Sequence, residues 1–175
     1  MALVVVNYPG ISEPDYAWIQ AIRAEHDIYH EMVSPHFTFV FPCSITDEAG
    51  FVGHVKRCTR GVKTIRFVLK CALVVKDCLS KYTHVFLIPD DGFSDIVRLR
   101  DRLYTGLLAS ELRLDIPFLP HIGIGSALSP EACKDLADNL NQGSFSVEGR
   151  IDTLDIASFD GEAMRTIERI QLGQD

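Results

Sequence analysis

The sequence predicts a small α/β protein made of two similar lobes, each a mostly antiparallel sheet with flanking helices, which face each other across a central groove. Three observations support this fold: the order strand, helix, strand, helix, strand occurs twice, both copies contain the same short string around a histidine, and no flexible linker separates them. At 175 residues, with 47% hydrophobic residues, the chain can bury one sizeable core. We therefore expect a single domain, 1–175, with one lobe from about 1–78 plus the C-terminal strands and the other from about 79–160.

The first copy contains an apolar strand, two helices with clear boundary signals and two further strands. The string Ser12-Glu13-Pro14-Asp15 has the composition of a helix start, and Gly61 follows the second helix. Aromatic and β-branched residues between Pro35 and Pro42 indicate a buried strand. The expected elements are a strand at 2–8, a helix at 16–26, a strand at 34–42, a helix at 47–60 and a strand at 65–75.

The second copy repeats this order and is followed by the C-terminal strands. Apolar residues recur at helical spacing from Ile96 to Leu107. Ser129 provides a cap for the next helix, and Pro130 fits its first position. The expected elements are a strand at 82–88, a helix at 93–110, a strand at 118–124, a helix at 129–141, strands within 144–159 with a break, and a strand at 164–172.

Composition limits the kinds of partner. The net charge is −7 and the pI is near 5.3, so the averaged surface field repels a long polyanion and a small phosphate ligand fits better. Two stretches are locally basic, and they form either a basic patch or the solvated faces of two helices. They comprise Lys56, Arg57, Arg60 and Lys63 in one stretch, and Arg98, Arg100 and Arg102 in the other.

Apolar patterning and cysteine usage point to the cytoplasm, and we expect a monomer with no membrane partner. The longest apolar stretches fall far short of the roughly 20 residues that span a membrane. The apolar N-terminus has no basic region ahead of it, so it is interpreted as a strand and not as an export signal. The five cysteines are odd in number, scattered and without a C-x-x-C pair, which argues against a disulfide framework or a zinc site.

The two copies share a histidine string at matched places. Pro35-His36-Phe37-Thr38-Phe39 corresponds to Pro120-His121-Ile122-Gly123-Ile124. Leu3 precedes His36 by 33 residues, and His84 precedes His121 by 37. Because side chains alternate along a strand, His36 shares a face with Thr38, and His121 shares a face with Gly123. The duplication can therefore place one imidazole on each side of the groove.

Two opposed imidazoles suit acid and base catalysis on a phosphodiester. An ordinary histidine titrates near pH 6.5, so one ring can accept a proton while the other donates one, and no metal ion is required. The Thr38 hydroxyl can donate to a non-bridging phosphate oxygen where charge accumulates. The sequence does not decide which histidine is the base. A metal site on His36 and His121 is the alternative, but no third ligand stands at a recognisable spacing.

Two H-x-[ST]-Φ strings in a duplicated α/β chain resemble the signature of the 2H phosphoesterases, which include bacterial 2′-5′ RNA ligases and cyclic nucleotide phosphodiesterases. The string from His36 to Phe39 fits this signature fully, whereas Gly123 lacks the hydroxyl of the second string. The resemblance implies a phosphodiesterase without metal or cofactor, acting on 2′,3′-cyclic or 2′-5′-linked phosphates of a nucleotide or an RNA end. It also implies reversible ligation, catalytic roles for His36 and His121, and substrate contacts at Thr38 and Gly123.

Two other functions remain open at this point. The chain could bind nucleotides or RNA without turnover, with Gly123 marking lost catalysis, or it could retain only the fold in a structural role. Gly123 itself indicates either close approach of a ligand or a bulge or tight packing. The remaining histidines, 26, 30, 54 and 84, lack the shared string, so surface or packing roles are expected. Stacking on a base or core packing are both open for Tyr8, Tyr29, Phe41 and Tyr82.

Overall fold

Two antiparallel sheets form the centre of the protein, as the expected fold requires. The computed structural model describes residues 2–161 and 163–173. The four-stranded sheet has the order β3 (Phe37–Cys43), β1 (Ala2–Asn7), β8 (Thr153–Phe159) and β9 (Met164–Gln171). The five-stranded sheet has the order β2 (Gly10–Ile11), β7 (Val147–Ile151), β4 (Ile65–Lys76), β5 (Thr83–Asp91) and β6 (Ile122–Ala127).

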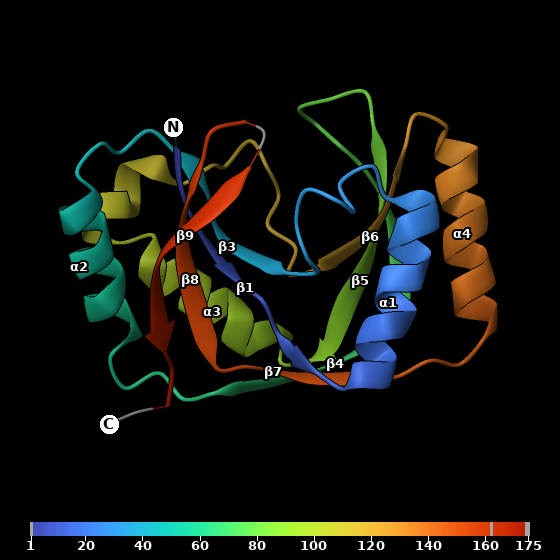
Figure 1. Ribbon diagram of the computed structural model, residues 1–175, viewed down its shortest axis with the longest axis horizontal. Coiled ribbons are helices and arrows are strands. Elements are labelled where there is room, and N and C mark those ends of the chain that lie inside the picture. The colour runs from blue at the N-terminus through green and yellow to red at the C-terminus, as the bar shows by residue number, and fades with distance from the viewer. Residues whose placement is uncertain (1, 162, 174–175) are drawn as a thin grey trace.

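Helices cover the outer side of each sheet (Figure 1). The five-stranded sheet packs against α1 (Glu13–His26) and α4 (Pro130–Gln142). The four-stranded sheet carries α3 (Phe93–Leu103), which packs in turn against α2 (Glu48–Thr59). Both serine caps work as expected, because the Ser12 and Ser129 hydroxyls accept backbone N–H groups in the first turns of α1 and α4. In the described residues no helix has the length and apolar character to cross a bilayer.

The two halves of the chain exchange elements between the lobes. The order β3-β1-β8 in one sheet corresponds to β6-β5-β4 in the other, yet β4 ends the first copy and β8 ends the second. Similarly α1 packs beside β6, and α3 packs beside β3. The division expected at about residue 78 therefore does not match the pairing of the strands. The short connection from β4 to β5 favours a hairpin, and this hairpin draws β4 into the five-stranded sheet.

Proline and glycine account for the elements whose ends differ from the expected ones. The strand expected from 118 begins at Ile122, because Pro120 has no N–H for a ladder. The helix expected at 93–110 ends at Leu103 and is followed by a 3₁₀ turn that starts at Gly106, whose φ is +50°. In contrast, β5 continues through Pro89, which is tolerated at a register irregularity.

One hydrophobic core extends through both lobes and fixes the strands that follow the two histidines. Phe37 is 1% exposed and packs edge-on against Phe67, with ring centroids 5.1 Å apart. Ile122 is 0% exposed at the corresponding place in β6. Burying such a side chain contributes roughly 1.5–3 kcal/mol, so each histidine directly precedes an anchored neighbour.

Candidate active site

His36 and His121 occupy equivalent places and line one cleft between the lobes. Each histidine lies one residue before a strand, β3 or β6, and each follows a buried proline. The cleft has a volume of about 430 Å³. Its lining contains both histidines, which satisfies the geometric expectation from the duplicated strings. Their chemical roles stay a prediction.

The same hydrogen bond orients both imidazoles. The Nδ1 atom of His36 lies 2.8 Å from the carbonyl oxygen of Ser34, and Nδ1 of His121 lies 2.6 Å from that of Leu119. A carbonyl can only accept, so each Nδ1 carries the hydrogen and donates it. In a neutral ring Nε2 is then the basic atom, and in a protonated ring it is an additional donor. Each half-site can therefore serve as base or as acid.

Burial makes both imidazoles poorer bases than free histidine. Desolvation is the main cause that lowers the pKa of His36, and the positive charge of Arg23 lowers it further. Desolvation likewise lowers the pKa of His121 to about 4, with additional repulsion from His36 and His84. Both rings are consequently neutral at pH 7 in the free protein. An anionic phosphate placed between them would favour protonation of one ring.

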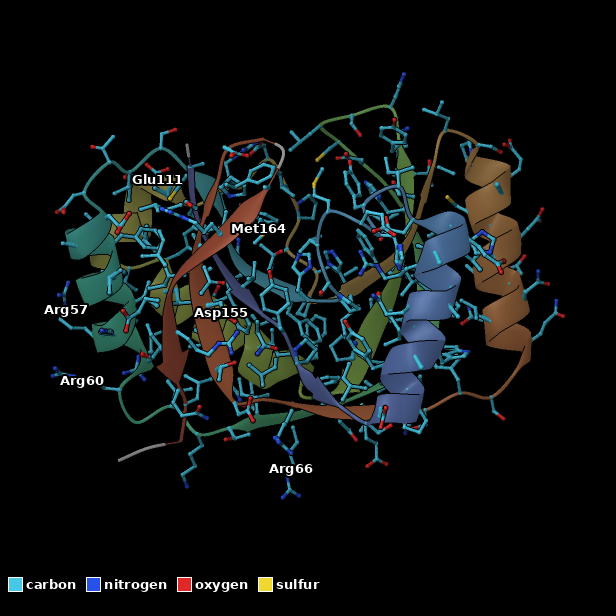
Figure 2. All side chains as sticks on the ribbon, in the orientation of Figure 1. Arg57, Arg60, Arg66, Glu111, Asp155 and Met164 are labelled. Carbon is cyan, nitrogen blue, oxygen red and sulfur yellow. The ribbon has the colours of Figure 1, made fainter. Side chains whose placement is uncertain are left out.

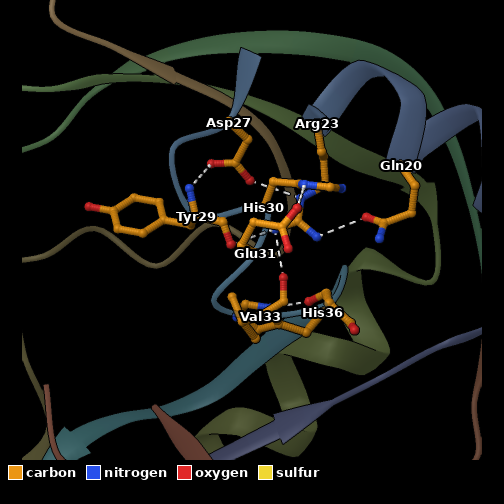
Figure 3. Close-up of polar contacts among 9 residues, drawn as sticks. Gln20, Arg23, Asp27, Tyr29, His30, Glu31, Val33 and His36 are labelled. Atoms are coloured by element: carbon orange, nitrogen blue, oxygen red, sulfur yellow. Dashed lines mark hydrogen bonds and ion pairs between the residues drawn. The ribbon is translucent and has the colours of Figure 1, made fainter. Parts of the chain in front are cut away.

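Arg23 is a buried cation that the sequence analysis did not identify (Figure 3). It projects from α1, is 2% exposed and lines the cleft. Its Nε donates to Asp27 at 2.8 Å, and its Nη2 donates to the carbonyl oxygen of Val33 at 2.7 Å. The Asp27 carboxylate also accepts the backbone N–H of Tyr29 at 3.0 Å. This network holds the loop that leads from α1 to His36, so Arg23 positions the first half-site.

His84 and Phe86 form a wall of the cleft behind His121. The Phe86 ring stacks on the His121 ring, with centroids 3.6 Å apart and an interplanar angle of 15°. The His84 ring also stacks on the Phe86 ring, with centroids 5.5 Å apart and an interplanar angle of 8°. Its Nε2 lies 3.5 Å from a carboxylate oxygen of Asp77. His84 thus makes a packing contact, as expected, and it also lines the cleft, because β5 pairs directly with β6.

Thr38 and Gly123 make the two half-sites different. Thr38 lines a recess of about 170 Å³ beside the cleft, together with His36, and Gly123 lines the cleft itself. The φ angle of Gly123 is not positive, and a Cβ atom built there meets nothing within 4 Å. Tight packing therefore does not explain this glycine. A register irregularity does lie next to it, between its pairing with Phe86 and the pairing of Gly125.

The strand beside each histidine strand adds a second difference. Val6 on β1 is the register partner of Thr38, and Phe86 on β5 is the register partner of Gly123. One half-site thus combines a small apolar side chain with a hydroxyl, whereas the other combines an aromatic ring with no side chain. The duplication has kept the two imidazoles and changed what surrounds them.

The other candidates from the sequence fall into three groups. His54 is a packing residue, since it is 4% exposed and its Nε2 lies 2.8 Å from the carbonyl oxygen of Leu103. His26 and His30 lie outside the cleft lining, whereas Tyr29 and Phe41 belong to it. The remaining aromatic candidates are Tyr8, whose ring lies 6.2 Å from that of His36, and Tyr82, which is outside the lining. Residues 2–161 and 163–173 contain no cluster of three side chains suited to a metal ion.

Known relatives resemble the chain over most of its length. A Bacillus licheniformis protein named "Putative phosphoesterase" is 22% identical over 150 residues, which covers 85% of this chain and 84% of that protein. A Bacillus cereus protein with the same description is 26% identical over 154 residues, covering 87% and 85%.

Solved structures share the fold. Escherichia coli LigT complexed with 3′-AMP superposes with a TM-score of 0.58 at 15% identity, covering 99% of this chain and 98% of LigT. Usb1 of Kluyveromyces marxianus gives 0.58 at 11% identity, covering 94% and 96%, and the TT0787 protein of Thermus thermophilus gives 0.61 at 15%, covering 98% of both chains. The model of the 2′-5′ RNA ligase superfamily matches residues 11–163. With that match and the paired histidine strings at one cleft, the chain belongs to the 2′-5′ RNA ligase superfamily of 2H phosphoesterases.

Proposed function

We propose that the protein is a metal-independent phosphodiesterase that acts on 2′,3′-cyclic or 2′-5′-linked phosphates of a nucleotide or an RNA end. The observation that carries the proposal is the pair of imidazoles, each fixed through Nδ1, on the lining of one cleft. Membership of a phosphoesterase family supports it. Because both half-sites come from one chain, we propose a monomer, and the free cysteines fit the cytoplasm.

The proposed reaction needs only proton transfers and charge stabilisation. The Nε2 atom of one histidine removes a proton from the attacking water, and Nε2 of the other donates a proton to the leaving oxygen. The Thr38 hydroxyl donates to a non-bridging oxygen as phosphorus becomes five-coordinate. The same groups serve ligation in the reverse direction, so the orientation of the substrate decides which of His36 and His121 is the base.

Nucleotides are the ligands named for two structural neighbours. LigT has been solved with 3′-AMP, and Usb1 of K. marxianus with uridine monophosphate. These ligands belong to those proteins, and the likeness itself concerns the fold. They nevertheless support a nucleotide as the ligand of a cleft whose lining here contains Tyr29, Phe41 and Phe86.

The proposed activity is tested with 2′,3′-cyclic nucleotides in the presence of a metal chelator. We expect hydrolysis to one nucleoside monophosphate, 2′ or 3′, at a rate that the chelator does not change. Product identification by chromatography against both standards shows which bond breaks. Tight binding without turnover would support the second candidate, a nucleotide-binding or RNA-binding protein with a degenerate site. The missing hydroxyl at Gly123 is the observation that favours that candidate.

The pH dependence should be bell-shaped with its maximum on the acid side. The free protein must hold one protonated and one neutral imidazole, and burial lowers the pKa of both His36 and His121, the latter to about 4. The protonated form is lost as pH rises, so kcat/KM should decline from below pH 6.5. The limb of kcat should lie at higher pH, because bound phosphate stabilises an imidazolium. The two apparent pKa values of the profile describe His36 and His121 as a coupled pair, and neither value is assigned to one ring.

Initial rates between pH 4 and 9 at constant ionic strength provide this measurement. A value of kcat/KM that increases steadily from pH 5 to 8 would contradict the proposed protonation states. A flat profile, with chemistry shown to be rate-limiting, would exclude acid and base roles for both rings.

A further inference from the structure

The described cleft lining contains one permanently charged cation, Arg23, and the Asp27 carboxylate already pairs with it. Arg23 is the sole Lys or Arg in the described cleft lining. A guanidinium has five N–H donors. Four of these N–H groups donate to the Asp27 carboxylate, the Gln20 side chain and the carbonyl oxygens of Tyr29 and Val33. Arg23 thus holds protein groups together and leaves little to offer a second or third phosphate.

The remaining charges near the cleft are of both signs. Lys76 and Lys81 are exposed near the His84 end of the wall, where Nζ of Lys76 donates to the carbonyl oxygens of Lys81 and Tyr82. Asp27 belongs to the lining and balances Arg23, with both side chains buried. Asp77 lies beside His84 at the end of the wall formed by His84 and Phe86. Burial keeps His36 and His121 neutral at pH 7 until an anion binds. The cleft therefore has the means to neutralise about one negative charge, by protonation of one imidazole.

A larger group of exposed cations lies at another edge of the molecule. Here the two basic stretches noted in the sequence do converge, because Lys63, Arg98 and Arg102 line one hollow. Arg100 is the exception, since it is 6% exposed and packs over Phe118. The outer basic residues are exposed and form no ion pair with a described residue: Arg57, Arg60, Lys63 and Arg66. Figure 2 shows Arg57, Arg60 and Arg66 pointing outward at the edge of the molecule.

This basic edge is far from the imidazoles. Arg66 lies on β4, seven residues before Leu73, which is the register partner of Phe86 beside His121. A strand rises about 3.3 Å per residue, so the two places are about 23 Å apart along β4. The hollows lined by Lys63, Arg66 and Arg150 share no residue with the cleft. With a net charge of −7 on the whole chain, the averaged surface field repels a polyanion that extends from the cleft.

We propose that the cleft selects a mononucleotide-sized phosphodiester with a single negative charge, in preference to an RNA end that carries several phosphates. This inference rests on the proposed phosphodiesterase function and narrows its substrate class. The carrying observations are Arg23, the sole Lys or Arg in the described cleft lining, whose N–H groups mostly bond protein groups, and the distance of the basic edge from the cleft.

The test compares a 2′,3′-cyclic mononucleotide with a ten-nucleotide RNA that ends in the same nucleotide and the same cyclic phosphate. Values of kcat/KM are measured from 50 to 300 mM KCl. We expect the mononucleotide to react at least tenfold faster. For the RNA, the slope of log kcat/KM against log salt should be shallower than −1, since each neutralised phosphate of a single strand contributes about −0.7. A faster RNA reaction with a slope of −2 or steeper would overturn the inference.

The triple variant Arg60→Gln, Lys63→Gln, Arg66→Gln is the matched control. All three side chains are exposed, so the fold should be unaffected. We expect unchanged kcat/KM for both substrates. A loss restricted to the RNA, with a flatter salt slope, would show that the basic edge guides RNA to the cleft and would overturn the inference.

Failure of the proposed function gives a different result. If neither substrate is hydrolysed, the protein is not a phosphodiesterase for this bond, and selection is measured by equilibrium binding of the same two uncleaved molecules. Tighter binding of the mononucleotide with a shallow salt slope would uphold the charge argument. Tighter binding of the RNA would overturn it.

Discussion

His36→Ala and His121→Ala should each reduce kcat for a 2′,3′-cyclic nucleotide on the order of 10²-fold or more, because each removes a general acid or base. Both rings are held by the same Nδ1 bond to a carbonyl two residues earlier, so both Nε2 atoms are committed to the cleft. The double variant should lose little beyond the single ones, since a base without its acid partner gains nothing. Single-turnover rates measure the effect, and thermal unfolding tests the fold.

His26→Ala is the appropriate control for these variants. Its side chain is 44% exposed and outside the cleft lining, so activity and stability should both be kept. His54→Ala is unsuitable, because that ring is buried and bonded to the Leu103 carbonyl. His84→Ala is equally unsuitable, because His84 belongs to the wall behind His121. Similar losses in the His26 variant and in the two cleft variants would point to a folding defect in place of a catalytic role.

The sequence was sufficient for most elements and for the histidine pair because their signals are local. Alternation, capping residues and the repeated Pro-His string lie within a few residues of the feature that they predict. The assignment of elements to lobes is different in kind. The amphipathic pattern of α1 predicts that this helix packs on a sheet, but it does not distinguish between the two sheets. The exchange of α1 and α3 depends on how the strands pair at long range, which periodicity does not contain.

Arg23 and His84 show the same limit within the site. In the sequence Arg23 is an ordinary helix residue followed by an acidic one at i+4, which normally indicates a solvated pair. It becomes buried because the chain after α1 returns over it and presents the Val33 carbonyl. His84 shares a strand face with Phe86, and this alternation was visible, but its meaning depends on the register with β6. Local signals were enough to predict the fold class. Arg23 and His84 could be identified as cleft residues only from the long-range packing and strand register of the structure.

Thr38→Ala should reduce kcat by roughly 10²-fold, equivalent to about 3 kcal/mol, because it removes the donor that holds charge on phosphorus. Thr38→Ser is the matched control, since it keeps the hydroxyl and should retain most activity. Thr38 and His36 line the same recess, and this shared recess is the structural reason to expect an effect at the first half-site. If Thr38→Ala leaves binding and turnover untouched, the phosphate role of this residue is wrong.

Gly123→Ser should raise turnover by restoring the hydroxyl that the second half-site lacks. Replacing this glycine should cause neither backbone strain nor a steric clash, because φ at Gly123 is not positive and an added Cβ atom has no neighbour within 4 Å. Gly123→Ala separates the two remaining explanations, since it adds the same Cβ without the hydroxyl. A gain in the serine variant alone means that the protein works with a weakened half-site. A loss of substrate binding in both variants means that the open space at Gly123 is occupied by the substrate, because Phe86 already fills the other side of that half-site against His121.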